Sequence, residues 1–193
     1  MSMAAEFGLT DIPDLSDVFE EQTATAPFED GVYEGIITKE RRITDRNGND
    51  RVFETSDGPS ASGTGRNIRL QIEVKRKSDG RALGTSYNVF YRPDDLSSET
   101  IARVIAHKES AKDEGGKVQW GELFGSFMTL QKLATLQKIA GVRSFARTPE
   151  GGLEVSGLYG KRVFATLGPD TRNPQYKEIK RLSADAPKRN PVL

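Results

Sequence analysis

The sequence contains no cysteine and only one histidine, His107, in 193 residues. Without cysteine there is no disulfide framework, no thiol nucleophile and no cysteine-ligated zinc or iron–sulfur site. One histidine also excludes most histidine-built metal sites and most Ser–His machinery. No apolar run approaches the roughly 20 residues that span a bilayer, and the acidic N-terminus has no signal-peptide pattern. We therefore expect a cytoplasmic protein that has no cofactor and makes no membrane contact.

Lysine and arginine are absent from residues 1–30, which carry eight of the 28 acidic residues and hence a charge of −8. The remaining residues hold 28 basic and 20 acidic side chains, a charge of +8 that cancels the first segment. We expect a flexible acidic N-terminal arm (1–30), a folded domain (31–184) and a flexible tail (185–193). Such asymmetry is typical of nucleic-acid-binding proteins, and the alternative is two ordinary solvated surfaces.

Three strands are predicted in the first half of the domain. Residues 31–44 are rich in β-branched and aromatic side chains, and residues 67–77 alternate apolar and polar. Asp79-Gly80 is a hairpin-turn dipeptide, after which residues 83–92 return as the third strand. Residues 56–65 have no large apolar side chain to pack and are expected to form a long flexible loop.

Two helices and two short strands complete the domain. Residues 94–112 have a serine cap and share an apolar face, and residues 120–142 carry an apolar stripe that ends at Gly141. The last strands are expected at 158–167 and 176–184. Five strands with a helical insertion between the third and fourth is the element order of an OB-fold, a five-stranded Greek-key barrel. A β-sandwich or an α+β roll with the same order stays open.

The domain resembles bacteriophage-encoded single-stranded DNA-binding proteins with OB-folds. The resemblance covers residues 31–184 and is carried by "GVYEGIITKE", "IRLQIEVKRKSDGRALGTSYNVFY", "LQKIAGV", "LYGKRVFATL" and "NPQYKEIKRL". It implies sequence-independent binding of single-stranded DNA in phage DNA replication or recombination, in the host cytoplasm. Bacterial single-strand-binding proteins end in an acidic tip that recruits partners, whereas this chain ends in "KRNPVL".

The alternation of the third strand predicts which side chains meet a bound strand. Thr85, Tyr87, Val89 and Tyr91 form the more apolar set and should face the interior. The outward set is then Asn88, Phe90 and Arg92, near Arg69, Gln71 and Lys75 of the second strand. Cations that follow phosphates and a ring that stacks on bases are what single-strand binding requires. Two alternatives are that Phe90 packs under the long loop, or that a bulge turns Tyr87 and Tyr91 outward instead.

Further cations are predicted to line the same groove, although a solvated surface role is the alternative for each. They are Lys39, Arg41, Arg42, Arg66, Arg76, Lys77, Arg81, Lys161, Arg162, Lys180 and Arg181. Arg162 and Phe164 form a second Arg–aromatic pair on an outer face. Trp120 is expected to pack in the core, and His107 to be a solvated helix residue.

No nucleophile–base pair is recognised, so the chain is not expected to be an enzyme. The alternative is a metal-dependent nuclease, for which the acidic pairs Asp94-Asp95 and Asp113-Glu114 could bind magnesium. Adjacent acidic residues before a helix more often cap it. The acidic arm is expected either to compete with DNA for the basic domain or to recruit replication or recombination proteins. Self-association into a homo-oligomer stays open. The rival function is a protein-interaction or virion assembly module that uses the same barrel.

Overall fold

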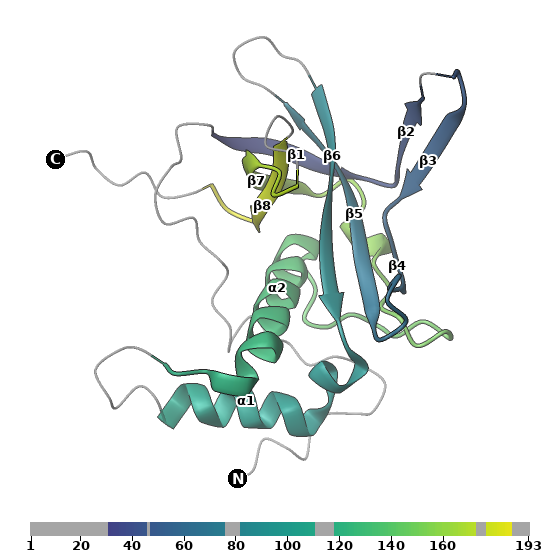
Figure 1. Cartoon of the computed structure of the whole chain (residues 1–193). Helices are drawn as coiled ribbons and strands as arrows, with labels where there is room; N and C mark the ends of the chain where they lie inside the picture. Colours follow the sequence, from purple (N-terminus) through teal and green to yellow (C-terminus); the bar gives the residue numbers. More distant parts are fainter. Residues whose placement is uncertain (1–30, 46, 76–81, 111–117, 173–176, 187–193) are drawn as a thin grey trace, which may run out of the picture.

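The computed structural model describes residues 31–45, 47–75, 82–110, 118–172 and 177–186. The acidic arm, the hairpin turn at 79–80 and residues 187–193 of the tail lie outside this part. The described fold is mainly β, with two antiparallel sheets and a helical insertion between the sixth and seventh strands (Figure 1).

The larger sheet is formed by six strands, and a separate hairpin forms the smaller one. The six strands are β1 (Val32–Thr38), β4 (Ser56–Pro59), β5 (Arg66–Lys75), β6 (Ala82–Tyr91), β7 (Arg162–Pro169) and β8 (Lys177–Ser183). The hairpin pairs β2 (Glu40–Thr44) with β3 (Asp50–Glu54). In the larger sheet β5 pairs with β4, β1 and β6, while β1 pairs with β7 and β7 with β8.

The β5–β6 pair confirms the predicted alternation. Its ladder runs without a bulge from Arg66 opposite Tyr91 to Lys75 opposite Ala82. Ile68, Leu70 and Ile72 of β5 are fully buried, and the inward side chains of β6 are buried with them. Since successive side chains of a strand point to opposite faces, this register fixes which residues face outward.

The predicted first strand and the predicted long loop are both corrected. Residues 31–44 form two strands rather than one, because β2 leaves the sheet after Thr38 to pair with β3. The segment expected as a loop at 56–65 begins with β4, which pairs with residues 66–69 of β5. Backbone hydrogen bonds hold β4 without an apolar side chain, so hydrophobic patterning gave no signal for it.

Helix α1 (Ser98–Ser110) and helix α2 (Phe124–Ala140) form the insertion. A 3-10 turn at Pro93–Leu96 precedes α1, and the Ser97 hydroxyl accepts a hydrogen bond from the Thr100 amide at 3.2 Å, which confirms the serine cap. Gly141 ends α2 in the left-handed conformation with φ 73°, as the sequence predicts. The predicted strand at 158–167 begins later, because a 3-10 turn occupies Ser156–Leu158.

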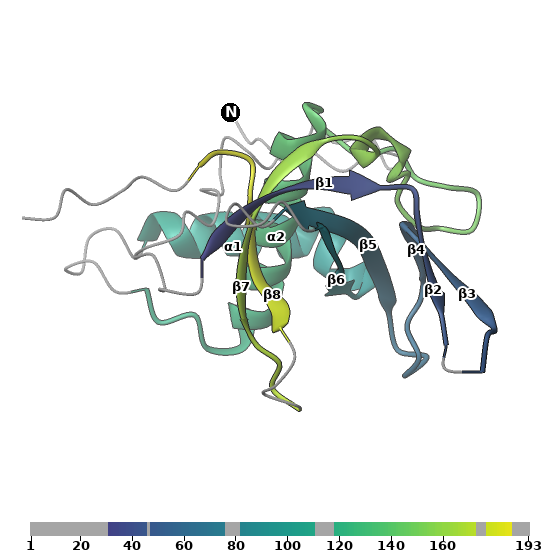
Figure 2. The ribbon, with the colours of Figure 1, turned by 90° about the horizontal axis from the view of Figure 1, so that it is seen from above.

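The larger sheet is not closed into a barrel, which corrects the five-stranded barrel prediction. Strands β6 and β8 contact each other, but no ladder joins them in the described part of the chain. Helix α2 stands beside the free edge of β6, where the Thr129 hydroxyl meets the Phe90 carbonyl at 3.5 Å. In Figure 2 the β2–β3 hairpin and the β7–β8 hairpin project to the same side of the sheet, with β5 and β6 between them.

Candidate nucleic-acid interface

A polar surface with one exposed aromatic ring lies on the outer side of the β5–β6 pair. It is formed at the end of β5 that pairs with β4 and by the residues of β6 opposite it. We call Asn67, Arg69, Asn88 and Phe90 the β5–β6 face. Arg69 and Asn88 are exposed and directly opposite in the ladder, and Asn67 lies opposite Phe90. The Phe90 side chain is 42% exposed, which confirms its predicted outward orientation. Exposed aromatic area beside a cation is available for stacking by a planar ligand.

One side of the Phe90 ring is covered by the turn that precedes β5. A Cβ added at Gly65 would lie 2.8 Å from the ring, so only a glycine fits beneath it. The prediction that Phe90 packs under the loop is therefore confirmed in part, since the loop covers part of the ring and leaves the rest exposed. A ring supported in this way loses little side-chain entropy when a ligand stacks on it.

Arg41 of β2 fastens the smaller sheet to the outer surface of the larger one. Its guanidinium donates to the Gln71 side chain at 3.1 Å, to the Gly84 carbonyl at 2.8 Å and to the Ser86 hydroxyl at 3.2 Å. It also lies over the Phe53 ring, 5.5 Å from the centroid. Gln71 is fully buried beneath it. Arg41 therefore positions the β2–β3 hairpin at the border of the β5–β6 face.

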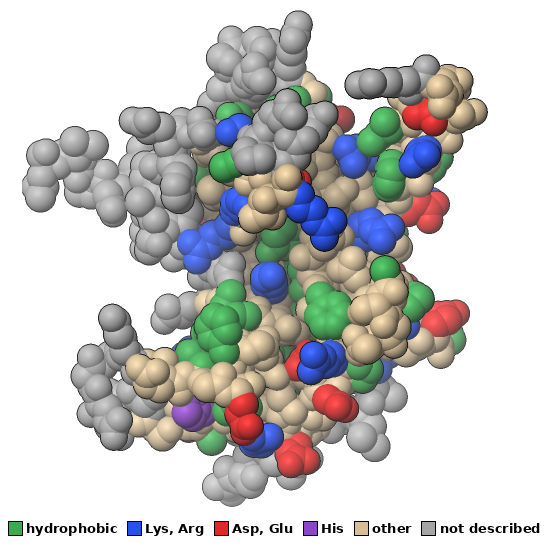
Figure 3. Space-filling model, in the orientation of Figure 1, with side chains coloured by type: hydrophobic (Ala, Val, Ile, Leu, Met, Phe, Trp, Pro, Cys, Tyr) green, Lys and Arg blue, Asp and Glu red, His purple; other side chains and the backbone are tan. Residues whose placement is uncertain are grey.

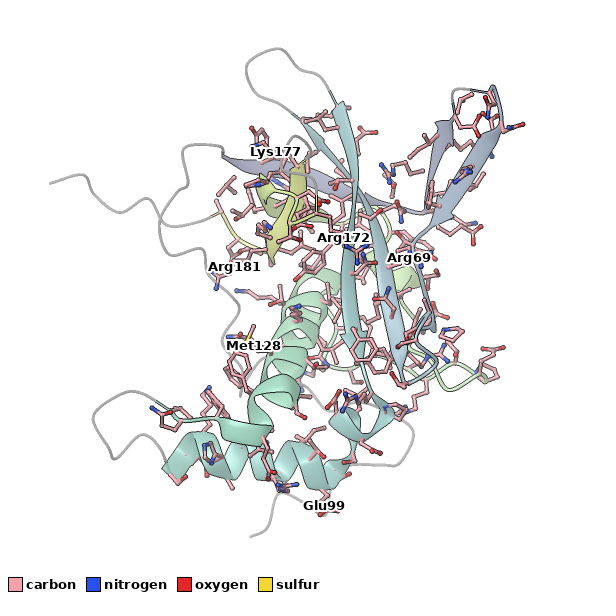
Figure 4. The ribbon with its side chains drawn as sticks, in the orientation of Figure 1. Arg69, Glu99, Met128, Arg172, Lys177 and Arg181 are labelled. Atoms are coloured by element: carbon pink, nitrogen blue, oxygen red, sulfur yellow. The ribbon has the colours of Figure 1, made fainter. Side chains whose placement is uncertain are left out.

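Cations from the β7–β8 hairpin lie on the other side of the face. Figure 4 shows Lys177 and Arg181 on β8, which contacts β6, and Arg172 beyond the end of β7, while Arg69 lies on β5. Figure 3 shows lysine and arginine side chains gathered over this half of the molecule. Burial raises the pKa of Tyr87 to about 12, and the positive charge of Arg181 opposes the rise, so Arg181 lies near the inward-facing side chain of Tyr87 on β6. The β5–β6 face thus lies between Arg41 of the β2–β3 hairpin and the net positive β7–β8 hairpin.

A groove of about 420 Å³ continues from this face to helix α2. We call it the β6–α2 groove. One wall carries Asn88, Phe90 and Arg92, and the other carries Gly125, Thr129 and Lys132 of α2. Asp95 and Glu122 complete the lining. Burial lowers the pKa of Lys132, whose amine forms no hydrogen bond or ion pair with other described residues.

The inward orientation predicted for Tyr87 and Tyr91 is confirmed, and the alternative of a bulge that turns them outward is wrong. Tyr87 is 8% exposed and Tyr91 is fully buried, because β6 has no bulge that would turn them outward. Arg66 is half-buried, and its guanidinium is paired with the buried Asp57 carboxylate at 3.1 Å rather than left available to a phosphate. The Tyr91 hydroxyl also donates to Asp57.

The remaining predicted cations are spread over the molecule. Arg42 and Lys180 are exposed but paired with Glu40 and Glu178 on their own strands. Arg162 is paired with Glu34 at 2.7 Å and lies over the Phe164 ring at 5.2 Å, at the end of β7 far in sequence from the β7–β8 turn. Three further cations are exposed, namely Lys39, Lys75 and Lys161. Arg76, Lys77 and Arg81 lie outside the described residues.

The aromatic and acidic residues singled out in the helices have structural roles. Trp120 stacks on Phe127 with ring centroids 3.9 Å apart and packs against the core, as predicted. His107 is half-buried rather than solvated, because its ring meets the Gln119 carbonyl at 2.8 Å and Trp120 at 5.3 Å. Asp95 accepts a hydrogen bond from the Arg92 amide at 2.8 Å, which is the capping role expected of it. Asp113-Glu114 lies outside the described residues.

Sequence reasoning missed Lys132, Arg172 and Lys177. Lys132 lies within the apolar segment of α2, and a lysine at that position was a signal that could have been used. Arg172 follows β7 and Lys177 begins β8. Which strands lie near these two residues depends on the order of strands in the sheet, so the local sequence could not predict that they lie near β6.

No helix in the described ranges is long and apolar enough to cross a bilayer. Among the same residues no three acidic or histidine side chains converge as metal ligands would. Comparisons of the chain with protein-family models, curated proteins and solved structures found no match.

Proposed function

We propose that the protein binds single-stranded DNA without sequence preference, and that it does so in phage DNA replication or recombination. The observation that carries the proposal is the half-exposed Phe90 ring near Arg69, on a sheet surface that lies between Arg41 of the β2–β3 hairpin and the cations of the β7–β8 hairpin. Stacking on an aromatic side chain contributes about 1–3 kcal/mol per base, and cations on either side follow the phosphates. No base edge is read in such a mode, so the binding is sequence-independent.

An open variant of the OB-fold is the architecture that we propose for this function. Strands β1, β5, β6, β7 and β8 stand in the places of its five strands, with the helices inserted between the third and the fourth. Oligonucleotides commonly bind such folds on the second and third strands and on the loops beside them. In this chain those strands are β5 and β6, and the neighbouring segments are the two hairpins that flank the β5–β6 face.

The test is a titration of fluorescently labelled oligo-dT, followed by anisotropy over a range of salt concentrations. We expect the affinity to fall steeply with salt, with a log–log slope of about −0.7 for each phosphate neutralised. Double-stranded DNA of the same length should bind more weakly, and labelled DNA kept with magnesium should stay intact. Equal affinity for both forms, or no salt dependence, would contradict the proposal and favour the protein-interaction or virion assembly module.

Phe90→Ala should weaken binding of oligo-dT about tenfold, which corresponds to the loss of about one stacked base. Phe124→Ala is the matched control, because Phe124 is the other exposed phenylalanine among the described residues, at 55%, and it lies on α2 rather than on the β5–β6 face. Arg69→Ala and Arg162→Ala form a second pair, since Arg162 is equally a surface arginine but is neutralised by Glu34. Equal losses within either pair would exclude the β5–β6 face as the binding surface.

A further inference from the structure

The β6–α2 groove holds a positive charge that the fold does not neutralise. Lys132 is half-buried on α2, and its amine has no partner among the described residues. Partial removal of an ammonium group from water is unfavourable unless an anion replaces the lost solvation. The pKa of Lys132 is lowered because burial removes part of the water around its amine. A bound anion would therefore gain more at Lys132 than at a fully solvated lysine.

The two carboxylates that line the groove are already engaged. Asp95 accepts hydrogen bonds from the Ser126 hydroxyl at 2.7 Å and from the Arg92 amide at 2.8 Å. Glu122 is paired with the Arg103 guanidinium at 3.0 Å. Neither acid is paired with Lys132, and the exposed Arg92 adds a second cation to the wall. Since Arg103 balances Glu122, the lining carries Lys132 and Arg92 against the single charge of Asp95, which leaves one positive charge for an anionic ligand.

An aromatic wall in the same groove narrows the class of ligand. Phe90 belongs to both the β5–β6 face and the groove, so a planar group stacked on its ring lies next to the space above Lys132. The groove volume of about 420 Å³ lies within the range of small-molecule pockets, about 300–1,000 Å³. A planar base joined to a phosphate can both stack on Phe90 and place a negative charge near Lys132, whereas free phosphate can do only the second.

We infer that the β6–α2 groove is a nucleotide subsite, in which one nucleotide of the bound strand stacks its base on Phe90 and places its phosphate on Lys132. This inference rests on the proposed function and assigns a role to a helix residue that lies outside the sheet surface. It makes α2 part of the binding surface and extends the path of the strand beyond the β5–β6 face. Thr129 fixes the two walls relative to each other through its contact with the Phe90 carbonyl.

The first test replaces Lys132 by an uncharged side chain of similar length in the full chain. Lys132→Met should weaken oligo-dT binding about fivefold at about 0.1 M salt and reduce the salt slope by about 0.7, the share of one phosphate. Lys138→Met is the matched control, since Lys138 lies on the same helix, is exposed and is paired with Asp185 at 2.7 Å. A thermal unfolding midpoint that does not fall in Lys132→Met shows that the variant is folded, because a desolvated amine has been replaced by a thioether.

The second test uses small probes to separate base from phosphate. In competition with labelled oligo-dT, dTMP should displace more strand than either thymidine or inorganic phosphate at the same concentration. This advantage should disappear in Lys132→Met and persist in Lys138→Met.

Two outcomes overturn the subsite. One is equal competition by dTMP and thymidine with the unmodified protein. The other is a Lys132→Met variant whose affinity and salt slope are unchanged while Phe90→Ala still weakens binding, which would leave the proposed function intact. Failure of the unmodified protein to bind oligo-dT would overturn both proposals together.

Discussion

The Asp57 carboxylate is a buried polar group that joins several segments of the described structure. Its side chain is 1% exposed and is paired with Arg66 at 3.1 Å. It also accepts hydrogen bonds from the Tyr91 hydroxyl and from the Leu153 amide, the latter at 2.6 Å. Through these contacts one residue of β4 joins β5, β6 and the segment that precedes β7. A buried carboxylate is tolerated here because each of its partners stabilises the charged form.

Asp57→Ala should therefore lower the free energy of unfolding by about 3–5 kcal/mol, because it leaves the Arg66 guanidinium largely buried without its counter-ion. Chemical denaturation followed by circular dichroism measures the change. Glu40→Ala is the control, since its pair with Arg42 is exposed and worth less than about 1 kcal/mol. A loss for Asp57→Ala no larger than that of the control would show that the network contributes nothing beyond a surface pair.

At the scale of elements, the β2–β3 hairpin is held by Arg41 and, directly after β3, by Thr55, whose hydroxyl accepts a hydrogen bond from the Gln71 amide at 2.8 Å. Arg41 is a polar link from the hairpin to the larger sheet, and neighbouring Arg42 points to the opposite side of the same strand and is exposed. The hairpin also displays Ile43 and Val52 at 40% and 47% exposure, so it buries little apolar surface of its own. An element with few buried contacts belongs to the low-stability end of a structure, where local opening is frequent.

Arg41→Met should raise amide hydrogen exchange within Glu40–Glu54 while β5 and β6 keep their protection. The loss also removes a hydrogen bond from the buried Gln71, so the free energy of unfolding should fall by about 1–3 kcal/mol. Arg42→Met is the matched control, with the same chemistry one residue away and no contact with the larger sheet in the described structure. If both variants exchange alike, Arg41 does not fix the hairpin.

At the scale of the whole molecule, a net charge of zero hides two opposite halves. Residues 1–30 carry −8 and the rest carries +8. Some of the described cations lie together over one surface, as Figure 3 shows. A tethered polyanion and a nucleic acid compete for the same field, and salt weakens that competition because the Debye length falls from about 30 Å at 0.01 M to about 8 Å at 0.15 M.

Removal of residues 1–30 should tighten oligo-dT binding about tenfold at about 0.01 M salt and much less at about 0.15 M salt. A full-length variant with the eight acidic residues changed to amides should behave like the truncated chain, because charge rather than length is responsible. Anisotropy titrations at both salt concentrations measure the effect. Unchanged affinity throughout would leave the segment with partner recruitment or with no role in binding.

The β5–β6 pair shows how far local pattern reaches. Alternation alone placed Ile68, Leu70 and Ile72 inside and Phe90 outside, since a strand has only two faces and one must be buried. The same reasoning put Gln71 on the polar surface, where it lies fully buried, because Arg41 from another sheet covers it. The alternation of apolar and polar residues predicts which face of the sheet a residue is on, but it does not predict which other segment packs on that face.

The sequence by itself determined the charge asymmetry, the helix ends and the register-defining alternation, because these depend on composition and on neighbours a few residues away. Only the tertiary structure decided that the sheet stays open, that β4 is a strand, that Arg66 serves Asp57, and that Lys132 shares a groove with Phe90. Each of these is a meeting of segments distant in the chain. Such meetings depend on how the free energies of burial, backbone pairing and desolvation balance over the entire fold, which no local window contains.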